Sequence, residues 1–312
     1  MTIAVLSGLI RPLVEPRLPE WVEPRWFMSK EEALQLAPEA EIGWFDFTQP
    51  GPMIEVVTAA TGLKWLNSIY AGLDFLPLDL LAERGVTVTN GAGINAITIA
   101  EYTVMLMLAH AKGYRAVVRA QDRHEWLLDS PGKRELFGER VLLLGLGAIG
   151  GLVKTRLEAF GMEVVPVRRS GGDGALKPDQ WRGDLGSFDW IVLAVPSTPD
   201  THGMIGAAEL ATMKPSAVLV NIARGEVIDQ DALMQALAAK RIEAALLDVT
   251  TPEPLPAEHP LWGLENAQVT MHLSGRAQTK MFQRSADRFI ENLARWHAGE
   301  PVEPRLDLAL GY

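Results

Sequence analysis

The stretch RVLLLGLGAIGGLVKTRLEAFGMEVVPVRRSGG, residues 140–172, decides the fold. An apolar strand runs into GLGAIG (145–150), a helical segment follows, and EVVPV (163–167) is typical of a second strand. In G-x-G-x-x-G spacing, the glycines permit a tight turn, close approach of a pyrophosphate, and close packing of helix on strand. Since the amides and dipole at the start of the helix favour phosphate, the stretch predicts a dinucleotide site. The residues expected to contact the cofactor here are Gly145, Gly147, Ala148, Ile149 and Gly150.

The end of the second strand bears on which dinucleotide binds. NAD-preferring sites usually carry an Asp or Glu about 20 residues beyond the glycines, where it accepts from the ribose hydroxyls. Here the strand ends in Arg168, Arg169 and Ser170, and the first acid is Asp173. Two guanidinium groups and a hydroxyl suit a 2′-phosphate. The sequence therefore favours NADPH, with NADH as the alternative if both arginines simply face solvent.

Apolar and helical segments continue to alternate after this unit. The further segments expected to be strands are WIVLAV (190–195), AVLVNIA (217–223), AALLDV (244–249) and AQVTMHL (267–273). With the two strands above they make six, the count of a complete doubly wound dinucleotide domain. A single long helix is expected to precede them, from about Asn95 to Ala120.

The first hundred residues alternate in the same way. Strands are expected at 3–7, 42–45, 64–69 and 86–90, and helices at 30–37, 52–62 and 78–85. This pattern favours a second, mostly parallel sheet, to which the amphipathic segment after residue 280 returns. The predicted fold class is α/β with two domains. Residues 95–280 form a central NAD(P)-binding Rossmann domain, a doubly wound parallel sheet inserted into a flavodoxin-like substrate domain of residues 1–94 and 281–312.

The composition limits the partners and the compartment. The 312 residues are 48% hydrophobic and 22% charged, as in globular proteins, and the net charge of −10 disfavours a nucleic-acid surface. There is no cysteine and no histidine pair at metal-ligand spacing, so neither a disulfide nor a metal is expected. The apolar start of the chain lacks a preceding basic region, and no uninterrupted apolar run reaches about 20 residues. We expect a cytoplasmic protein without a membrane segment.

Three strands of the second half end in groups of complementary chemistry. NIARGEVID (221–229) places Arg224 after one strand, DVTTPEPLP (248–256) places Glu253 after the next, and HLSG (272–275) begins with His272. Ligands of open α/β sheets bind outside the carboxyl ends of the strands, so these side chains are expected to converge. They suit reduction of a 2-oxo acid. Arg224 holds the carboxylate and polarises the carbonyl, His272 donates a proton as hydride arrives, and Glu253 orients the imidazole and favours its protonated form.

The order of these motifs resembles the D-isomer-specific 2-hydroxyacid dehydrogenase family over nearly the whole chain. The matching stretches are NSIYAGLD (67–74), TNGAGINAITIAEYTVMLMLA (89–109), GLGAIG, VPSTPDTHGMI (195–205), NIARGEVID, DVTTPEPLP and HLSG. In that family a substrate domain is built from both termini around a central Rossmann domain. The arginine pair is similar to that of the family's NADPH-using glyoxylate and hydroxypyruvate reductases.

The resemblance implies roles for individual residues. The family's catalytic Arg, Glu and His fall on Arg224, Glu253 and His272, and its carboxamide-binding acid falls on Asp248. Further cofactor contacts are expected from Val195, Pro196, Thr201, Ile222, Ala223 and Gly275.

The resemblance also implies a substrate-binding turn, and two departures from the family pattern are visible. The turn, whose backbone amides hold the substrate carboxylate, falls on Tyr70, Ala71 and Gly72. Tyr70 stands where many members have a glycine, which predicts a narrower carboxylate pocket. Met271 replaces the usual proline before His272, which predicts a looser turn.

Family members often dimerise through the long helix and the arm that follows it. A homodimer through residues 95–138 is therefore expected. In some members an arm tryptophan reaches the partner's active site. Trp126 is the candidate for that role here, and plain burial at the dimer interface is the alternative.

The resulting functional hypothesis is an NADPH-preferring reductase. It would convert a small 2-oxo acid of the glyoxylate or hydroxypyruvate type to a D-2-hydroxy acid. Two alternatives remain open: an NAD-dependent dehydrogenase of a bulkier D-2-hydroxy acid, and a catalytically weak regulator that senses NAD(P). No residue of the chain carries a unique signature for the substrate's side chain.

Overall fold

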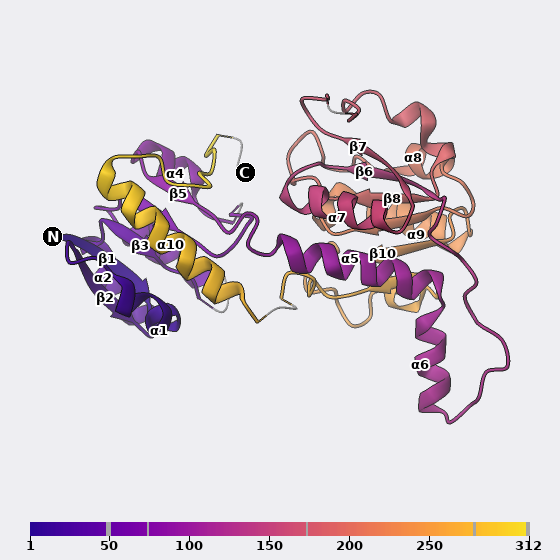
Figure 1. Ribbon diagram of the computed structural model, residues 1–312, viewed down its shortest axis with the longest axis horizontal. Coiled ribbons are helices and arrows are strands. Elements are labelled where there is room, and N and C mark those ends of the chain that lie inside the picture. Colours follow the sequence, from indigo (N-terminus) through magenta and orange to yellow (C-terminus); the bar gives the residue numbers. More distant parts are fainter. Residues whose placement is uncertain (48–50, 74, 173, 277–278, 310–312) are drawn as a thin grey trace. The chain divides into compact units, whose positions relative to one another are not determined.

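The computed structural model describes residues 1–47, 51–73, 75–172, 174–276 and 279–309 (Figure 1). The chain divides into two compact units. The outer unit consists of Met1–Asn95 and Gln278–Tyr312, and the central unit is Ala96–Ala277. Each unit is built on its own parallel sheet.

The outer unit contains a five-stranded sheet in the order β2-β1-β3-β4-β5, and all of its pairings are parallel. Its strands are β1 (Thr2–Ser7), β2 (Val22–Phe27), β3 (Ile42–Trp44), β4 (Trp65–Asn67) and β5 (Thr87–Thr89). Its helices are α1 (Arg11–Val14), α2 (Lys30–Leu36), α3 (Gly51–Ala59), α4 (Leu78–Glu83) and α10 (Met281–Ala298). This strand order is that of flavodoxin, so the predicted fold of this unit is confirmed.

The side chains of the outer sheet alternate between two cores. Val5 packs with residues of α2, α3 and α4, whereas its neighbour Leu6 packs with α1 and α10. Phe289 of α10 lies 4.9 Å from the Trp44 ring and 5.3 Å from the Trp65 ring, measured between centroids. The C-terminal helix α10 therefore packs against one face of the sheet that the N-terminal segment forms.

One strand of the outer sheet was absent from the predicted set. The sequence pattern indicated four strands before residue 90, and β2 is the fifth. It carries Pro24, opposite Ala4 of β1. Proline lacks the amide hydrogen that a central strand donates. β2 is an edge strand of the sheet, where proline is tolerated.

The central unit contains a six-stranded parallel sheet in the order β11-β10-β9-β8-β6-β7. Its strands are β6 (Arg140–Leu144), β7 (Glu163–Val167), β8 (Trp190–Leu193), β9 (Val218–Asn221), β10 (Ala244–Leu247) and β11 (Ala267–Val269). Its helices are α5 (Ala96–Ala111), α6 (Tyr114–Asp122), α7 (Ala148–Ala159), α8 (Ala207–Thr212) and α9 (Gln230–Ala238). All six predicted strands are present.

Helices cover both faces of this sheet. Alternate residues of β6 again point to opposite sides: Leu143 packs with α5 and α7, and Leu142 with α8 and α9. The chain reverses direction across the sheet between β6 and β8, which makes the carboxyl ends of these strands the switch point of a doubly wound fold. The Rossmann prediction is confirmed.

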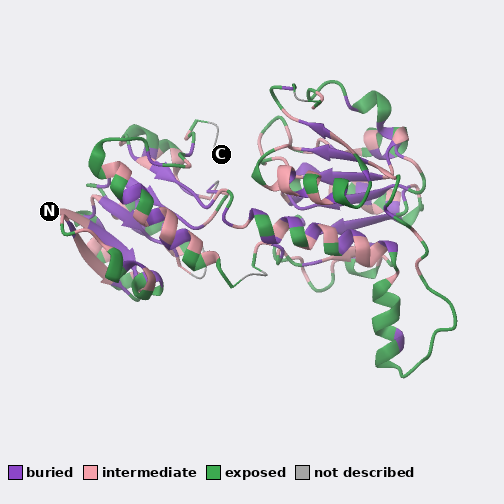
Figure 2. Ribbon diagram, in the orientation of Figure 1, coloured by how far each residue is buried: buried purple, intermediate pink, exposed green. Residues whose placement is uncertain are grey.

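The predicted single helix over 95–120 is wrong. Two helices, α5 and α6, are separated by Gly113, whose φ of 61° is left-handed. A Cβ at Gly113 would lie 2.8 Å from the amide nitrogen of Gly132, so glycine also permits the returning arm to approach. Beyond this break α6 projects from the central unit and is almost entirely exposed (Figure 2). No helix in the described ranges is long and apolar enough to cross a membrane.

Candidate active site

The predicted site residues of the central unit follow the carboxyl ends of its parallel strands. Gly145 comes after β6, Arg168 after β7, Val195 after β8, Arg224 after β9, Asp248 after β10 and His272 after β11. Because these ends meet at one edge of the sheet, the topology gathers groups that are far apart in sequence.

The glycine turn has the geometry that a pyrophosphate requires. Gly145 has a φ of 106°, and a Cβ there would lie 2.4 Å from the Ala194 carbonyl oxygen. A Cβ at Gly150 would lie 2.0 Å from the Gly145 carbonyl oxygen. Gly147, the exposed N-cap of α7, differs, because its Cβ would meet no atom of the described structure within 4 Å. Open space at Gly147, beside the first-turn amides of Ala148 and Ile149, fits the phosphates of a dinucleotide.

The turn after β7 presents two guanidinium groups. Arg168 is half-buried and its Nε donates to the Gly171 carbonyl at 2.6 Å. Arg169 and Ser170 are exposed, and the Ser170 hydroxyl donates to the same carbonyl at 3.3 Å. Asp173, the first acid after this strand, lies outside the described residues. Within the described part, this turn is therefore cationic where an NAD-preferring site would present a carboxylate.

The other predicted cofactor contacts lie on loops that follow β8, β9 and β11. The Thr201 hydroxyl donates to the Pro196 carbonyl at 2.7 Å and accepts from the Thr198 amide at 2.9 Å, so Thr201 fixes the loop that contains Val195. The remaining residues of this set are the buried Ile222 and Ala223 and the half-buried Gly275.

Arg224 is held by a buried asparagine that the sequence interpretation missed. The Asn221 amide group donates to the Arg224 carbonyl at 2.9 Å and accepts from the Ala223 amide at 3.0 Å. A Cβ at Gly225 would lie 2.2 Å from the Thr250 carbonyl oxygen, so the Arg224 loop approaches the loop that carries Glu253. The signal for Asn221 was a polar residue at the end of an otherwise apolar strand.

Glu253 and His272 form a direct pair. His272 Nδ1 lies 2.7 Å from Glu253 Oε2, and Glu253 Oε1 accepts from the Thr250 amide at 3.1 Å. Since Nδ1 is engaged, Nε2 is the nitrogen that points away from the carboxylate. Burial, the largest single influence, raises the pKa of Glu253, whereas the hydrogen bond and the charge of His272 lower it. The Thr250 amide and the Arg224 guanidinium lower it further, so the net pKa lies below the usual value.

Asp248 is buried, and its carboxylate is engaged by the turn that carries His272. Its Oδ1 accepts from the Thr270 hydroxyl at 2.8 Å and from the amides of Leu273 and Ser274 at 3.1 and 3.2 Å. Its Oδ2 accepts from the Ser274 hydroxyl at 2.5 Å. The His272 amide donates to the Asp248 carbonyl, also at 2.5 Å. Sequence interpretation gave Asp248 a cofactor contact and missed this anchoring of the turn, which Thr270 and Ser274 signal.

The turn itself is left-handed at two consecutive residues. Met271 and His272 have φ of 56° and 55°, a conformation that costs non-glycine residues on the order of 1–3 kcal/mol each. A proline ring locks φ near −65° and does not fit this conformation at position 271. The carboxylate of Asp248 anchors this turn, and a looser turn because of Met271 stays a prediction.

The predicted substrate turn belongs to the outer unit. The Tyr70 amide donates to the Ser68 hydroxyl at 3.1 Å, and the Tyr70 carbonyl accepts from the Gly91 amide at 2.8 Å. The Tyr70 hydroxyl donates to the Phe47 carbonyl at 2.8 Å. Ala71 is exposed and Gly72 half-buried, so both residues are accessible to solvent.

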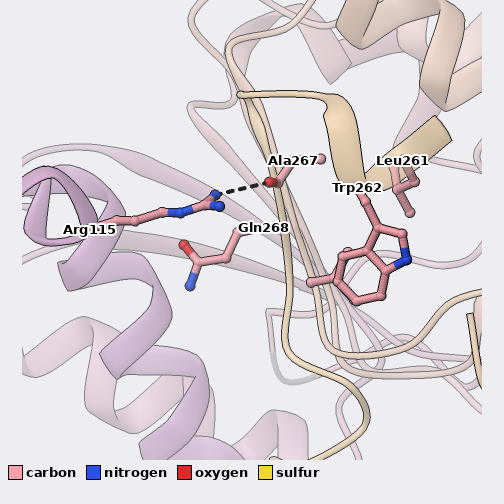
Figure 3. A pocket seen from close by; sticks show the side chains of 6 residues that line it. Arg115, Leu261, Trp262, Ala267 and Gln268 are labelled. Carbon is pink, nitrogen blue, oxygen red and sulfur yellow. Dashed lines mark hydrogen bonds between the residues drawn. The ribbon is translucent and has the colours of Figure 1, made fainter. Parts of the chain in front are cut away.

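A cavity of about 300 Å³ lies beside the edge strand β11 and contains none of these groups (Figure 3). Arg115 of α6 reaches across it and donates to the Ala267 carbonyl at 3.5 Å, with Gln268 and Trp262 beside it. Within the described ranges, no cluster of three or more His, Asp or Glu side chains is arranged to hold a metal.

Comparison with known proteins places this architecture among its relatives. Residues 104–274 match the model "D-isomer specific 2-hydroxyacid dehydrogenase, NAD binding domain". A D-3-phosphoglycerate dehydrogenase of Mycobacterium tuberculosis is 32% identical over 321 residues, covering 100% of this chain and 60% of that protein. A glyoxylate reductase of Korarchaeum cryptofilum is 32% identical over 261 residues, covering 81% and 78%. The chain spans only 54–60% of the length of the D-3-phosphoglycerate dehydrogenases that it matches.

Solved structures agree with these matches over nearly the full chain. A D-isomer specific 2-hydroxyacid dehydrogenase family protein from Aeromonas salmonicida has a TM-score of 0.87 at 30% identity, covering 98% of this chain and 99% of that one. An NADPH-dependent glyoxylate/hydroxypyruvate reductase from Sinorhizobium meliloti, in complex with NADP and malonate, has a TM-score of 0.80 at 25% identity. That match covers 99% of this chain and 98% of the other.

Proposed function

This chain belongs to the D-isomer specific 2-hydroxyacid dehydrogenase family, and within it we propose that the protein reduces a small 2-oxo acid to a D-2-hydroxy acid. The substrate class is of the glyoxylate or hydroxypyruvate type, and NADPH is the favoured reductant. The single observation that carries the proposal is the Glu253–His272 pair at 2.7 Å, with Arg224 close enough to lower the pKa of Glu253.

The proposed chemistry divides between the cofactor and three side chains. A nicotinamide cofactor, when bound, would supply the hydride for the carbonyl carbon. His272 Nε2 gives its proton to the carbonyl oxygen, so the C=O bond becomes C–OH and the imidazole is left neutral. The Arg224 guanidinium donates to the carbonyl and carboxylate oxygens and stabilises the negative charge that develops. Glu253 holds Nδ1, which fixes the orientation of the ring.

The remaining assignments concern binding. We assign the carboxylate of the substrate to the backbone amides of Ala71 and Gly72. The pyrophosphate falls to the turn at Gly147 and the first amides of α7, with Val195, Thr201 and Ile222 on the adjoining loops. Asp248 is expected to accept from the carboxamide of the nicotinamide, in addition to holding the His272 turn. The assignment of this contact rests on the position of Asp248 alone, because Asp248 directly follows β10.

The identity of the product tests the proposed reaction. With NADPH and hydroxypyruvate in excess, we expect glycerate to accumulate in a one-to-one ratio with NADPH oxidised. Chiral chromatography should show the D enantiomer. L-glycerate, or oxidation of NADPH without glycerate, contradicts the proposal.

The preference for NADPH rests on the turn after β7. Arg168 and Arg169 are cations that can form charge-assisted hydrogen bonds with a 2′-phosphate, and NADH has no group to receive them. The Sinorhizobium meliloti reductase, similar to this chain at 25% identity, is named as NADPH-dependent. Use of NADH with equal efficiency is the alternative.

We expect replacement of both arginines by alanine to raise the KM for NADPH about 100-fold, because two charge-assisted contacts are each worth on the order of 1.5 kcal/mol. The KM for NADH should change less than threefold. Initial rates with each cofactor measure both values. Arg182→Ala is the matched control, since Arg182 pairs with Glu209 at 2.9 Å on the same unit. Equal effects on the two cofactors would show that the arginines do not contact the 2′-phosphate.

One observation favours a specific alternative. The D-3-phosphoglycerate dehydrogenase relatives support an NAD-dependent dehydrogenase of a bulkier hydroxy acid. Oxidation of D-3-phosphoglycerate with NAD, faster than reduction of glyoxylate with NADPH, would establish it. The third candidate is a regulator that senses NAD(P). It predicts tight cofactor binding without turnover, and the preserved Arg224, Glu253 and His272 argue against it.

We also propose that the protein is a homodimer through residues 95–138. The arm after α6 exposes large apolar side chains, with Trp126 90% and Leu128 97% exposed. They line a hollow of about 750 Å³ against α6. Large apolar side chains that lie close together on the surface are characteristic of protein–protein interfaces. A second copy of the chain is the proposed occupant, as the family resemblance implies.

Charging this surface tests the dimer. The double variant Trp126→Glu and Leu128→Glu is expected to sediment as a monomer at micromolar concentration, where the parent sediments as a dimer. Met28→Glu, which charges an exposed side chain of the outer unit, is the control. Trp126→Ala is expected to raise the KM for the oxo acid about fivefold if Trp126 reaches the partner's site, since interface anchors are worth about 1–2 kcal/mol. Unchanged kinetics in a dimeric Trp126→Ala protein would leave plain burial as its role.

A further inference from the structure

A buried carboxylate lies beneath the proposed substrate turn. Asp46 follows β3 and is buried inside the outer unit. Its Oδ1 accepts from the Ser68 hydroxyl at 2.6 Å. Its Oδ2 accepts from the Ile69 amide at 2.7 Å and from the Trp44 indole at 2.5 Å. All three partners are neutral, so this carboxylate organises donors and is not one half of a salt bridge.

Ser68 extends this network by one residue. Its hydroxyl oxygen donates to Asp46 and also accepts from the Tyr70 amide at 3.1 Å. The amides of Ile69 and Tyr70 are therefore directed into the unit. The other side of the turn is tied to the segment after β5: the Tyr70 carbonyl accepts from the Gly91 amide, and the Ala71 carbonyl accepts from the Asn90 side chain at 2.7 Å.

Two amides of the turn remain as donors. Across the described residues, neither the Ala71 amide nor the Gly72 amide forms a hydrogen bond. They directly follow the two amides that Asp46 and Ser68 turn inward. A pair of adjacent free amides at an exposed turn is a binding site for a carboxylate, provided that the turn is held rigid.

We propose that Asp46 and Ser68 are positioning residues that turn the Ile69 and Tyr70 amides inward and so preset the Ala71 and Gly72 amides for the substrate carboxylate. This role rests on the proposed function of the turn. Asp46 touches no reacting atom and acts through the backbone.

The cost of burying Asp46 supports a functional role. Burial raises the pKa of Asp46 to about 6, although the Ser68 hydroxyl, the Ile69 amide and the Trp44 indole each lower it. Since the pKa of Asp46 is higher in the folded state than in the unfolded state, the folded protein binds the proton more tightly between about pH 4 and pH 6. Stability therefore falls as pH rises through that window, and the ionised group destabilises the fold at neutral pH. If this position only filled space in the core, a neutral side chain would do so without the free-energy cost of burying a charge.

Asparagine cannot replace the carboxylate in this network. Its oxygen can accept from Ile69 and Trp44, but its amide nitrogen then faces Ser68 and donates. The buried Ser68 hydroxyl would lose its acceptor, and the contact that orients Tyr70 would shift. Protonation of Asp46 has a similar effect, because one oxygen becomes a donor. The titratable side chain of the same turn, Tyr70, is bonded through its hydroxyl to the Phe47 carbonyl, and no charged group among the described residues contributes to the pKa of Asp46.

Binding of oxalate, followed by amide resonances, tests this role without requiring turnover. Oxalate is titrated into the NADP-loaded, ¹⁵N-labelled protein at pH 7.5 and at pH 5. In the parent protein we expect the Ala71 and Gly72 amide resonances to shift most. Asp46→Asn and Ser68→Ala should bind oxalate about tenfold more weakly than the parent at pH 7.5. The ratio of the parent affinity to the Asp46→Asn affinity should fall to about twofold at pH 5, because Asp46 of the parent is then protonated and titration elsewhere in the site affects both proteins.

The matched control is Glu41→Gln. Glu41 precedes β3, at the end opposite Asp46, and pairs with Lys64 at 2.7 Å. This variant also converts a carboxylate to an amide next to an end of β3, and it should bind oxalate like the parent. Kinetics add a second readout: Asp46→Asn and Ser68→Ala should raise the KM for glyoxylate about tenfold and change kcat less than twofold.

The outcomes separate this inference from the proposed function. Failure of the parent to reduce any oxo acid contradicts the proposed function, whereas the oxalate titration still reports on the turn. Oxalate shifts that avoid Ala71 and Gly72 overturn the positioning role. Equal affinities of parent, Asp46→Asn and Ser68→Ala, all folded, overturn it as well.

Discussion

Replacement of His272 by glutamine is expected to lower kcat by about 10³-fold, because glutamine can hydrogen-bond to Glu253 but cannot deliver a proton to the carbonyl oxygen. General acids contribute on the order of 10²–10⁴-fold to such steps. The KM for NADPH should remain within about twofold of the parent, since His272 belongs to the turn after β11 and not to the glycine turn. Steady-state reduction of glyoxylate measures kcat, and fluorescence titration measures cofactor affinity.

The chain offers a matched control for this variant. His110 Nε2 lies 2.9 Å from Glu243 Oε1, so it is a second imidazole–carboxylate pair in the same unit. Glu243 directly precedes β10, at the amino-terminal edge of the sheet, away from the strand ends that carry the site. His110→Gln should leave kcat unchanged. A His272→Gln protein that keeps a tenth of the parent kcat would show that another group protonates the substrate.

Replacement of Arg224 by glutamine is expected to lower kcat/KM by about 10³-fold. The variant removes both the fork that holds the carboxylate and the charge that stabilises the developing oxyanion, and one such donor alone is worth about 10²–10³ in rate. Arg224→Lys should recover part of the loss, about tenfold, since it restores the charge but not the paired donors. A lower kcat, in addition to a higher KM, would identify a role in the transition state.

Arg241→Gln serves as the control for Arg224. Arg241 precedes β10 and donates to the Ala211 carbonyl, at the opposite edge of the sheet from Arg224. Its replacement removes one positive charge from the same unit without reaching the strand ends. Comparable losses in the two variants would mean that net charge, and not the position of Arg224, determines the rate.

The sequence was most informative where local pattern and chemistry coincide. GLGAIG could be interpreted because an apolar strand precedes it and a helix follows, and the structure confirms both elements. The central six strands were predicted because buried parallel strands are nearly continuous apolar runs. The strand β2 could not be predicted in this way, because it is not a continuous apolar run. Its Pro24 lacks an amide and suits the edge of a sheet, and edge position is a tertiary property.

The supporting contacts of the site were beyond prediction for a related reason. His272 and Glu253 were identified by residue type, but the anchoring of the His272 turn by Asp248 joins residues more than 20 positions apart through a left-handed turn. Asp46 is another such case. In FDFTQP it resembles an ordinary loop acid, and only the fold places it beneath Ser68 and Ile69. Long-range hydrogen bonds of this kind leave no periodic trace in a sequence.

Initial rates with NADPH and with NADH against glyoxylate, hydroxypyruvate, pyruvate and phenylpyruvate decide whether the protein is an NADPH-preferring reductase of small 2-oxo acids. We expect the highest kcat/KM with NADPH on glyoxylate or hydroxypyruvate, at least tenfold above the same acid with NADH. Absence of turnover with all four acids, in a protein that still binds NADPH, would contradict the proposed reductase activity.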